Sequence, residues 1–161
     1  MSRLLIVSLL AVTLGFRDPG PSSFTIDPGA RAELRALWFA SIAARGERVA
    51  CLASHIDGDT VRITHVQPLD DSTVDSLAVG AARSLETCGP PAWQGTAHTH
   101  IALYDGQRAY STFSGADRGV MLAWGQRWRM QGTFCLLFGE TSIHCELDGP
   151  SGSLIFPSIR Y

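Results

Sequence analysis

Two histidines and a Ser-x-x-Asp pair stand close together in the middle of the sequence and are of types that bind metal ions. The stretch GTAHTHIALYDGQRAYSTFSGAD holds His98 and His100, separated by one residue, and Ser114 three residues before Asp117. Because side chains alternate across a strand, His98 and His100 would project from the same face, about 7 Å apart along the chain. Imidazole and carboxylate groups bind Zn²⁺, and a catalytic zinc site has three protein ligands with one position open. These residues are therefore candidate ligands, with Asp117 as the third.

Each of these residues also has a plain structural interpretation. A His-x-His pair is common on exposed strands, and Ser114 with Asp117 can form a capping box at the start of a helix. Glu47 would on its own be a solvated residue at the end of a helix. Ser111 is a second candidate serine, although only Ser114 stands three residues before an aspartate, and Asp105 is an alternative ligand. The pattern as a whole must decide between these interpretations.

The order of the residues resembles the JAMM motif of the MPN+ (JAB-domain) zinc metallopeptidases. That motif has a glutamate, then His-x-His, then Ser-x-x-Asp, and this chain has Glu47 in ERVACLASHI, then GTAHTH, then FSGADRGVMLAW. The resemblance implies that His98, His100 and Asp117 bind a zinc ion. It further implies that Glu47 is the general base and that Ser114 stabilises the oxyanion.

The resemblance extends roughly from Ala30 to Cys145 and implies a fold as well as a site. It implies a single α/β (α+β) domain of the cytidine-deaminase-like, JAB-MPN type, with a central mixed sheet flanked by helices. Two features depart from the family: Ile101 stands where a proline is usual, and the gap from His100 to Ser114 is several residues longer. The longer loop is tolerable, because added loop length costs little closure entropy.

The implied function is that of a zinc-dependent metallopeptidase or isopeptidase, which hydrolyses an amide bond in a peptide or protein such as a ubiquitin-like or envelope protein. One alternative is a catalytically inactive MPN-like binding domain. Another is an exported, disulfide-stapled binding domain in which the histidines are incidental. Family members often dimerise, so a homodimer is one option. The net charge of −2, with no run of Lys or Arg, gives no electrostatic footprint for nucleic acid.

The N-terminus differs in composition from the rest of the chain. The run LLIVSLLAVTLGF after Met1-Ser2-Arg3 has the length of a secretory h-region, about 7–15 residues, and is shorter than a membrane span of about 20. RDPGPSS then has the composition of a linker. We therefore expect residues 1–23 to be a signal peptide or apolar segment with a linker, and residues 24–161 to be the domain. The protein would be exported, secreted or periplasmic, and would meet a membrane only through this segment; the alternative is a cytoplasmic protein.

Four cysteines would permit two disulfides in an exported protein, with three possible connectivities. They are Cys51, Cys88, Cys135 and Cys145. Cys135 and Cys145 flank a predicted turn at Gly139-Glu140 and could face each other across a hairpin. In a cytoplasmic protein all four would instead be small buried apolar residues.

The hydrophobic pattern predicts the elements that position these residues. Residues 25–46 are typical of a helix with Asp27 as N-cap and Pro28 in its first position. Its apolar face would comprise Leu34, Leu37, Trp38 and Ile42. We expect a hairpin of strands at 47–56 and 60–69, a helix at 73–86, a strand at 94–103, a helix from 114 to about 124, and two or three final strands. His55, His65 and His144 have no partner pattern and are interpreted as surface or half-buried strand residues.

Overall fold

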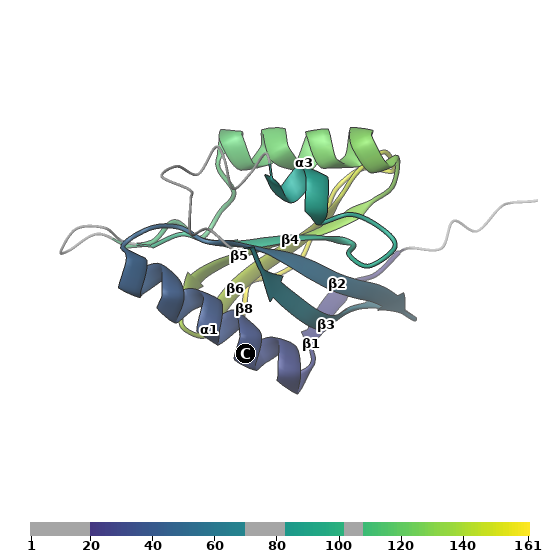
Figure 1. The fold of residues 1–161 in the computed structure, drawn as a ribbon. Helices are drawn as coiled ribbons and strands as arrows, with labels where there is room; N and C mark the ends of the chain where they lie inside the picture. The colour runs from purple at the N-terminus through teal and green to yellow at the C-terminus, as the bar shows by residue number, and fades with distance from the viewer. Residues whose placement is uncertain (1–19, 70–82, 102–107) are drawn as a thin grey trace, which may run out of the picture.

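A curled, mixed β-sheet forms the centre of the structure, a computed structural model that describes residues 20–69, 83–101 and 108–161 (Figure 1). The strands follow the order β1-β3-β2-β4-β5-β6-β7 across the sheet, and β8 pairs with β6. Their bounds are β1 Ser23–Ile26, β2 Val49–Asp57, β3 Thr60–Pro68, β4 Gly95–Thr99, β5 Gly132–Gly139, β6 Ser142–Asp148, β7 Leu154–Ile155 and β8 Ile159–Arg160. The β1–β3 and β4–β5 pairs are parallel and the others are antiparallel. The predicted α+β class is confirmed at this level.

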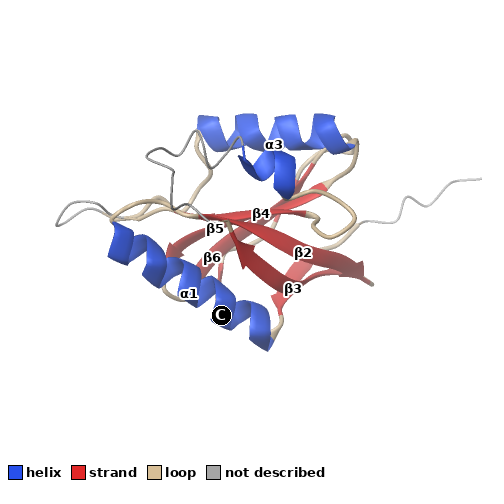
Figure 2. Ribbon diagram, viewed as in Figure 1, coloured by secondary structure: helices blue, strands red, loops and turns tan. Residues whose placement is uncertain are grey.

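Helices lie on both faces of the sheet (Figure 2). Helix α1 (Pro28–Ala44) covers one face, while α3 (Gly115–Trp128) and the helical residues 83–87 lie over the other. None of the described helices has the length and apolarity needed to cross a membrane. The two faces of the sheet therefore belong to two separate layers of side chains.

Side-chain alternation divides the interior into two cores. The larger core lies between the sheet and α1, and Ala97 of β4 points into it. The smaller core lies on the α3 side and consists of Phe113, Met121, Trp124, Phe134 and Leu136. Thr96 and His98, the neighbours of Ala97 in β4, line a cavity on this second side. The candidate site thus lies on the α3 face, beside the smaller core.

Helix α1 begins as predicted, with Asp27 at the N-cap position and Pro28 in the first turn, although the Asp27 side chain makes no capping hydrogen bond. Leu34 and Leu37 are buried as expected. Ile42 is 47% exposed, so its predicted place in the core is wrong.

Ser41 takes the buried position near the end of α1 instead of Ile42. Its hydroxyl donates to the Leu37 carbonyl oxygen at 3.1 Å and shares a hydrogen bond of 2.6 Å with Thr99 Oγ1 of β4. The helix therefore meets the sheet through paired hydroxyl groups at this end, which the apolar pattern does not indicate.

Two further predictions differ from the structure at the start of elements. Ser23–Ile26 forms β1, parallel to β3, where the sequence pattern predicts a linker followed by a helix. Phe24 and Ile26 are buried by this pairing. Strand β2 begins at Val49, so Glu47 precedes the strand rather than opening it.

The helix expected at 73–86 lies mostly outside the described residues, but 83–87 are helical. Residues 1–19 and Asp105 also lie outside them.

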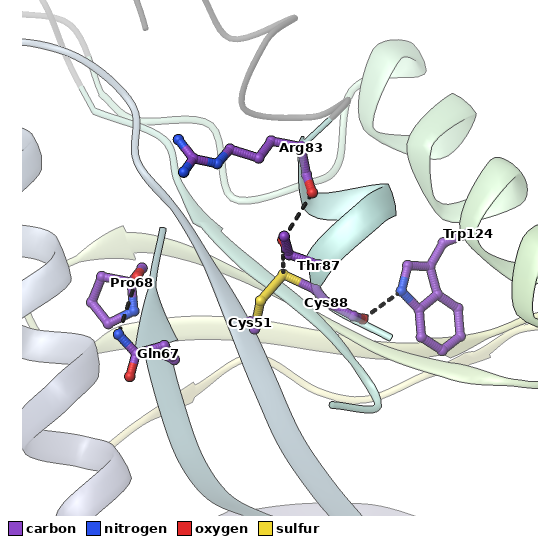
Figure 3. The surroundings of a disulfide bond; sticks show 7 residues. All are labelled: Cys51, Gln67, Pro68, Arg83, Thr87, Cys88 and Trp124. Atoms are coloured by element: carbon purple, nitrogen blue, oxygen red, sulfur yellow. Dashed lines mark hydrogen bonds between the residues drawn. A yellow bond between two sulfur atoms is a disulfide. The ribbon is translucent and has the colours of Figure 1, made fainter. Parts of the chain in front are cut away.

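All four cysteines form disulfides. Cys135 and Cys145 are directly opposite each other in β5 and β6 and are bonded, which confirms the predicted hairpin contact. Cys51 of β2 is bonded to Cys88, just after the helical residues 83–87 (Figure 3). The Cys88 carbonyl oxygen also accepts a hydrogen bond of 2.8 Å from Trp124 Nε1. Two disulfides are compatible with an exported protein.

Candidate metal centre

The three predicted ligands come together from two elements. His98 lies in β4, His100 follows directly after its end, and Asp117 lies in the first turn of α3. The two Nε2 atoms are 3.2 Å apart. His98 Nε2 is 3.3 Å from Asp117 Oδ1, and His100 Nε2 is 3.5 Å from Asp117 Oδ2. One ligand atom from each residue lies within 4.8 Å of the other two, so this group could hold a metal ion.

The His100 ring is oriented by a backbone group. Its Nδ1 lies 3.1 Å from the carbonyl oxygen of Tyr110. Because a carbonyl oxygen only accepts hydrogen bonds, Nδ1 must carry the hydrogen and donate it. In the neutral ring the lone pair is then on Nε2, which faces His98 and Asp117. Histidines that bind metals commonly have their other nitrogen fixed in this way.

Asp117 also takes part in a capping box with Ser114. The Ser114 backbone N–H donates to Asp117 Oδ2 at 2.6 Å, and the Asp117 backbone N–H donates to Ser114 Oγ at 3.2 Å. The structural interpretation of this pair is therefore confirmed, and the same contacts aim the carboxylate at the histidines. Ser114 also lines the cavity, and its side chain is among the groups that lower the pKa of Asp117.

Glu47 lies beside these ligands and is half-buried, so it is not a freely solvated residue. Glu47 is held in place through the next residue, Arg48, which makes two hydrogen bonds with Thr99. The Arg48 backbone N–H donates to Thr99 Oγ1 at 2.9 Å, and the Arg48 carbonyl oxygen accepts from the Thr99 N–H at 3.0 Å. Thr99 stands between the two histidines in the sequence. This backbone pairing brings Glu47 to the same end of the sheet as His98 and His100.

The ionisable groups of the site influence one another. Burial raises the pKa of Glu47 above its ordinary value, although the two histidines oppose this shift. Burial also acts to raise the pKa of Asp117, but hydrogen bonds from His100 and His98 outweigh it and hold that pKa well below the usual range. Burial acts to lower the pKa of His100, yet its hydrogen bond with Asp117 leaves it raised. The site thus favours an ionised Asp117.

A cavity of about 480 Å³ adjoins these groups. Glu47, the three candidate ligands and Ser114 all line it, together with apolar side chains from the sheet and α3. The structure therefore places the five predicted site residues around one space. Ser111, the alternative serine, is described and does not line this cavity.

Sequence patterns did not indicate a buried ionic network behind α3. Arg118, next to Asp117, makes two hydrogen bonds with the carboxylate of Glu146 in β6, one of them 2.8 Å long. His144 Nε2 lies 2.9 Å from Glu146 Oε1, and Glu146 is only 1% exposed. His144 is itself buried, so its expected surface or half-buried position is wrong. In the sequence, the only indication of this network is that His144 and Glu146 stand on either side of Cys145, which places both side chains on the same face of a strand.

This network positions the first turn of α3. Arg118 links the helix to β6, and its guanidinium carbon lies 5.2 Å from the centre of the Phe113 ring. The Phe113 ring in turn packs against the His98 ring, with centroids 5.6 Å apart. Burial acts to raise the pKa of Glu146, but the hydrogen bonds from Arg118 and His144 outweigh it and lower this pKa.

We expect Glu146→Gln to lower the free energy of unfolding by about 2 kcal/mol at pH 7, because it removes a buried, hydrogen-bonded charge. Since folding lowers the pKa of Glu146, its carboxylate stabilises the fold above the ordinary value of 4.5 and loses that effect as the pH falls below it. The difference between wild type and variant should therefore shrink below pH 4.5. Urea denaturation at several pH values measures this difference in the free energy of unfolding.

Glu140→Gln is the control, because Glu140 forms an exposed ion pair with Arg35. It should lower the free energy of unfolding by only about 0–1 kcal/mol. An equal loss in both variants would contradict a special role for Glu146.

Comparisons with known proteins do not name a family for this chain. No protein-family model matches it, and no curated protein does. Among solved structures, it is similar to the solution structure of protein DSY2949 from Desulfitobacterium hafniense, with 15% identity and a TM-score of 0.45. That match covers 83% of this chain and 91% of the other. The function must therefore be argued from the site itself.

Proposed function

We propose that this protein is a zinc-dependent hydrolase of amide bonds, a metallopeptidase or isopeptidase of the JAMM/MPN+ type with the corresponding JAB-MPN fold. The observation that carries the proposal is the convergence of His98, His100 and Asp117 with Glu47 and Ser114 around one cavity. These five residues come from three separate parts of the sequence. Their order is that of the JAMM motif.

The donor set fits zinc. Two imidazole nitrogens and a carboxylate oxygen are ligands that Zn²⁺ accepts in catalytic sites, whereas Ca²⁺ and Mg²⁺ prefer oxygen ligands. Atoms about 2.0–2.1 Å from a tetrahedral ion lie about 3.3–3.4 Å from one another. His98 Nε2 and His100 Nε2 are 3.2 Å apart; His98 Nε2 lies 3.3 Å from Asp117 Oδ1, and His100 Nε2 lies 3.5 Å from Asp117 Oδ2. With one ligand atom taken from each residue, all three atoms lie within 4.8 Å of one another, so small side-chain adjustments would bring them to the spacing of such an ion.

The remaining residues can perform the proton and charge transfers of hydrolysis. A zinc ion at this site would polarise a substrate carbonyl and lower the pKa of water to about 7. Glu47 can accept the proton of the attacking water and pass it to the leaving amine, as a general base and then a general acid. The Ser114 hydroxyl can donate a hydrogen bond to the developing oxyanion. Asp117 keeps its negative charge because its pKa is low.

The two disulfides and the apolar N-terminal segment support export, which favours a peptide or an envelope protein as substrate. The same disulfides keep an exported binding domain as the alternative function. Metal content distinguishes the metallopeptidase from the binding domain, because histidines that are not ligands would not bind one zinc ion per chain.

We expect the purified protein to contain about one zinc ion per chain, measured by mass spectrometry of the metal after dialysis. His98→Ala should lower the zinc affinity by more than about 100-fold, since even the loss of a group that only hydrogen-bonds to a metal ligand costs about 10–100-fold. Asp117→Asn is the sharper variant, because an amide oxygen can still accept from the Ser114 N–H while the charge is lost. It too should weaken zinc binding.

His65→Ala is the matched control, because His65 also pairs with a carboxylate, that of Glu33 at 2.7 Å, but lies in β3 away from the cavity. It should bind zinc as the wild type does. A wild-type protein that takes up no zinc, or a His98→Ala variant that binds it normally, would reject the proposed metal centre.

A further inference from the structure

We propose that the substrate carries a large apolar side chain beside the scissile amide bond, and that the cavity next to the candidate metal centre binds this side chain. The inference rests on the proposed function, because the candidate ligands define where the scissile bond would lie. It adds a substrate class to that function. The cavity walls, its size and the placement of its charges support it.

One side of the cavity is formed by residues of the sheet, next to the candidate ligands. Thr96 precedes His98 by two residues and lies on the same face of β4. Phe134 of β5 is paired with Thr96, and Val49 of β2 is paired with His98. This floor is therefore mostly apolar and runs away from the histidines along β4.

The opposite wall comes from α3, through Val120 and Met121. Met121 and Phe134 also belong to the smaller core, where the Phe134 ring meets Trp124 edge to face with centroids 5.6 Å apart. Trp124 is in turn hydrogen-bonded to the carbonyl of the disulfide-bonded Cys88. Packed aromatic rings and a disulfide therefore hold the walls in place, so the cavity is formed before a ligand arrives.

The volume of about 480 Å³ is within the range of about 300–1,000 Å³ of small-ligand sites. Two residues of a strand span about 7 Å, so the floor at Thr96 lies about one long side chain away from His98. A substrate carbonyl held at the ligands would then place a neighbouring Phe, Leu or Met side chain over Thr96 and Phe134. Glycine would leave this space unfilled.

The charged residues of the lining lie at one end only. Glu47 and Asp117 are at the metal end, and no Lys or Arg is among the described residues that line the cavity. An acidic side chain would lose its hydration here without gaining a partner of opposite sign, which is unfavourable. An apolar side chain would instead gain from burial. The cavity therefore selects for apolar side chains and against acidic ones.

The test is a methyl NMR titration of the metal-free protein with three small amides that differ in one side chain. The probes are N-acetyl-phenylalaninamide, N-acetyl-glycinamide and the α-amide of N-acetyl-glutamate, whose side-chain carboxylate is free. We expect the phenylalanine compound to bind at least about tenfold more tightly than the other two. Its largest shifts should fall on the methyl groups of Val49, Val120 and Met121.

Two substitutions on one helix locate the binding. Val120→Trp should fill the cavity and abolish the shifts of Val49 and Met121. Leu122→Trp is the matched control, because Leu122 is 59% exposed on α3, and it should bind the phenylalanine compound as the wild type does. The comparison of the three probes with wild type does not depend on either variant folding.

The results separate this inference from the proposed function when zinc uptake is measured in parallel on a second portion of the same metal-free preparation. Preference for the phenylalanine compound in a protein that binds no zinc would support the apolar site and reject the metallopeptidase. Zinc binding together with equal affinity for all three probes would leave the metallopeptidase standing and overturn the apolar specificity. Shifts that persist in Val120→Trp would also overturn it.

Discussion

Glu47→Gln is expected to reduce peptide hydrolysis by about 10²–10⁴-fold while the zinc content stays unchanged. The carboxylate of Glu47 is half-buried beside His98 and His100, and burial raises its pKa. An amide has nearly the same shape but cannot accept the proton of the attacking water. Because Glu47 is outside the group of three mutually close ligand atoms, its replacement should not release the metal.

This expectation is measured with quenched fluorescent peptides that carry Phe or Leu beside the cleaved bond, and with metal analysis of the same preparations. Glu140→Gln is the matched control, because Glu140 lies at the turn between β5 and β6, outside the cavity lining. It should keep full activity. A loss of less than about tenfold in Glu47→Gln would remove Glu47 as general base. Loss of zinc along with activity would make it a ligand instead.

The second large effect concerns the disulfide between Cys51 and Cys88. Replacing both by alanine should lower the free energy of unfolding by about 4 kcal/mol, since the bond closes a loop of 37 residues. The bond between Cys135 and Cys145 closes a loop of 10 residues, for which the same loop-entropy relation gives about 2.7 kcal/mol. The longer loop should therefore matter more, although both pairs are fully or almost fully buried.

Urea denaturation of the two double variants tests this order, and each serves as the control for the other. The Cys51–Cys88 bond also ties residues 83–88 to β2, and the Cys88 carbonyl accepts a hydrogen bond from Trp124 (Figure 3). Ser84, in the same segment, lines the cavity. Loss of the Cys51–Cys88 bond should therefore weaken binding of N-acetyl-phenylalaninamide as well, whereas loss of Cys135–Cys145 on the other side of the sheet should not. The reverse order of stabilities would contradict the loop-entropy explanation.

Elements with strong local signals were predicted well. The start of α1 at Pro28, the β2–β3 hairpin around Gly58 and the start of α3 after Ser114 all follow from caps and turns within a few residues. The Cys135–Cys145 contact follows in the same way from a short hairpin. Local propensity cannot predict the parallel pairing of β1 with β3 or the Cys51–Cys88 bond, because each joins segments far apart in the chain.

For the candidate site, too, the sequence determined some features and the tertiary structure determined others. The sequence alone determined the residue types and their order, namely Glu47, His98, His100, Ser114 and Asp117, and the capping box that starts α3. The tertiary structure decided that the Asp117 carboxylate reaches both imidazoles, that Glu47 is half-buried, and that an apolar cavity opens beside them. The physical reason is that helix caps and turns arise from neighbouring residues, whereas a binding site requires side chains from β4, α3 and the chain before β2 to be packed against one sheet.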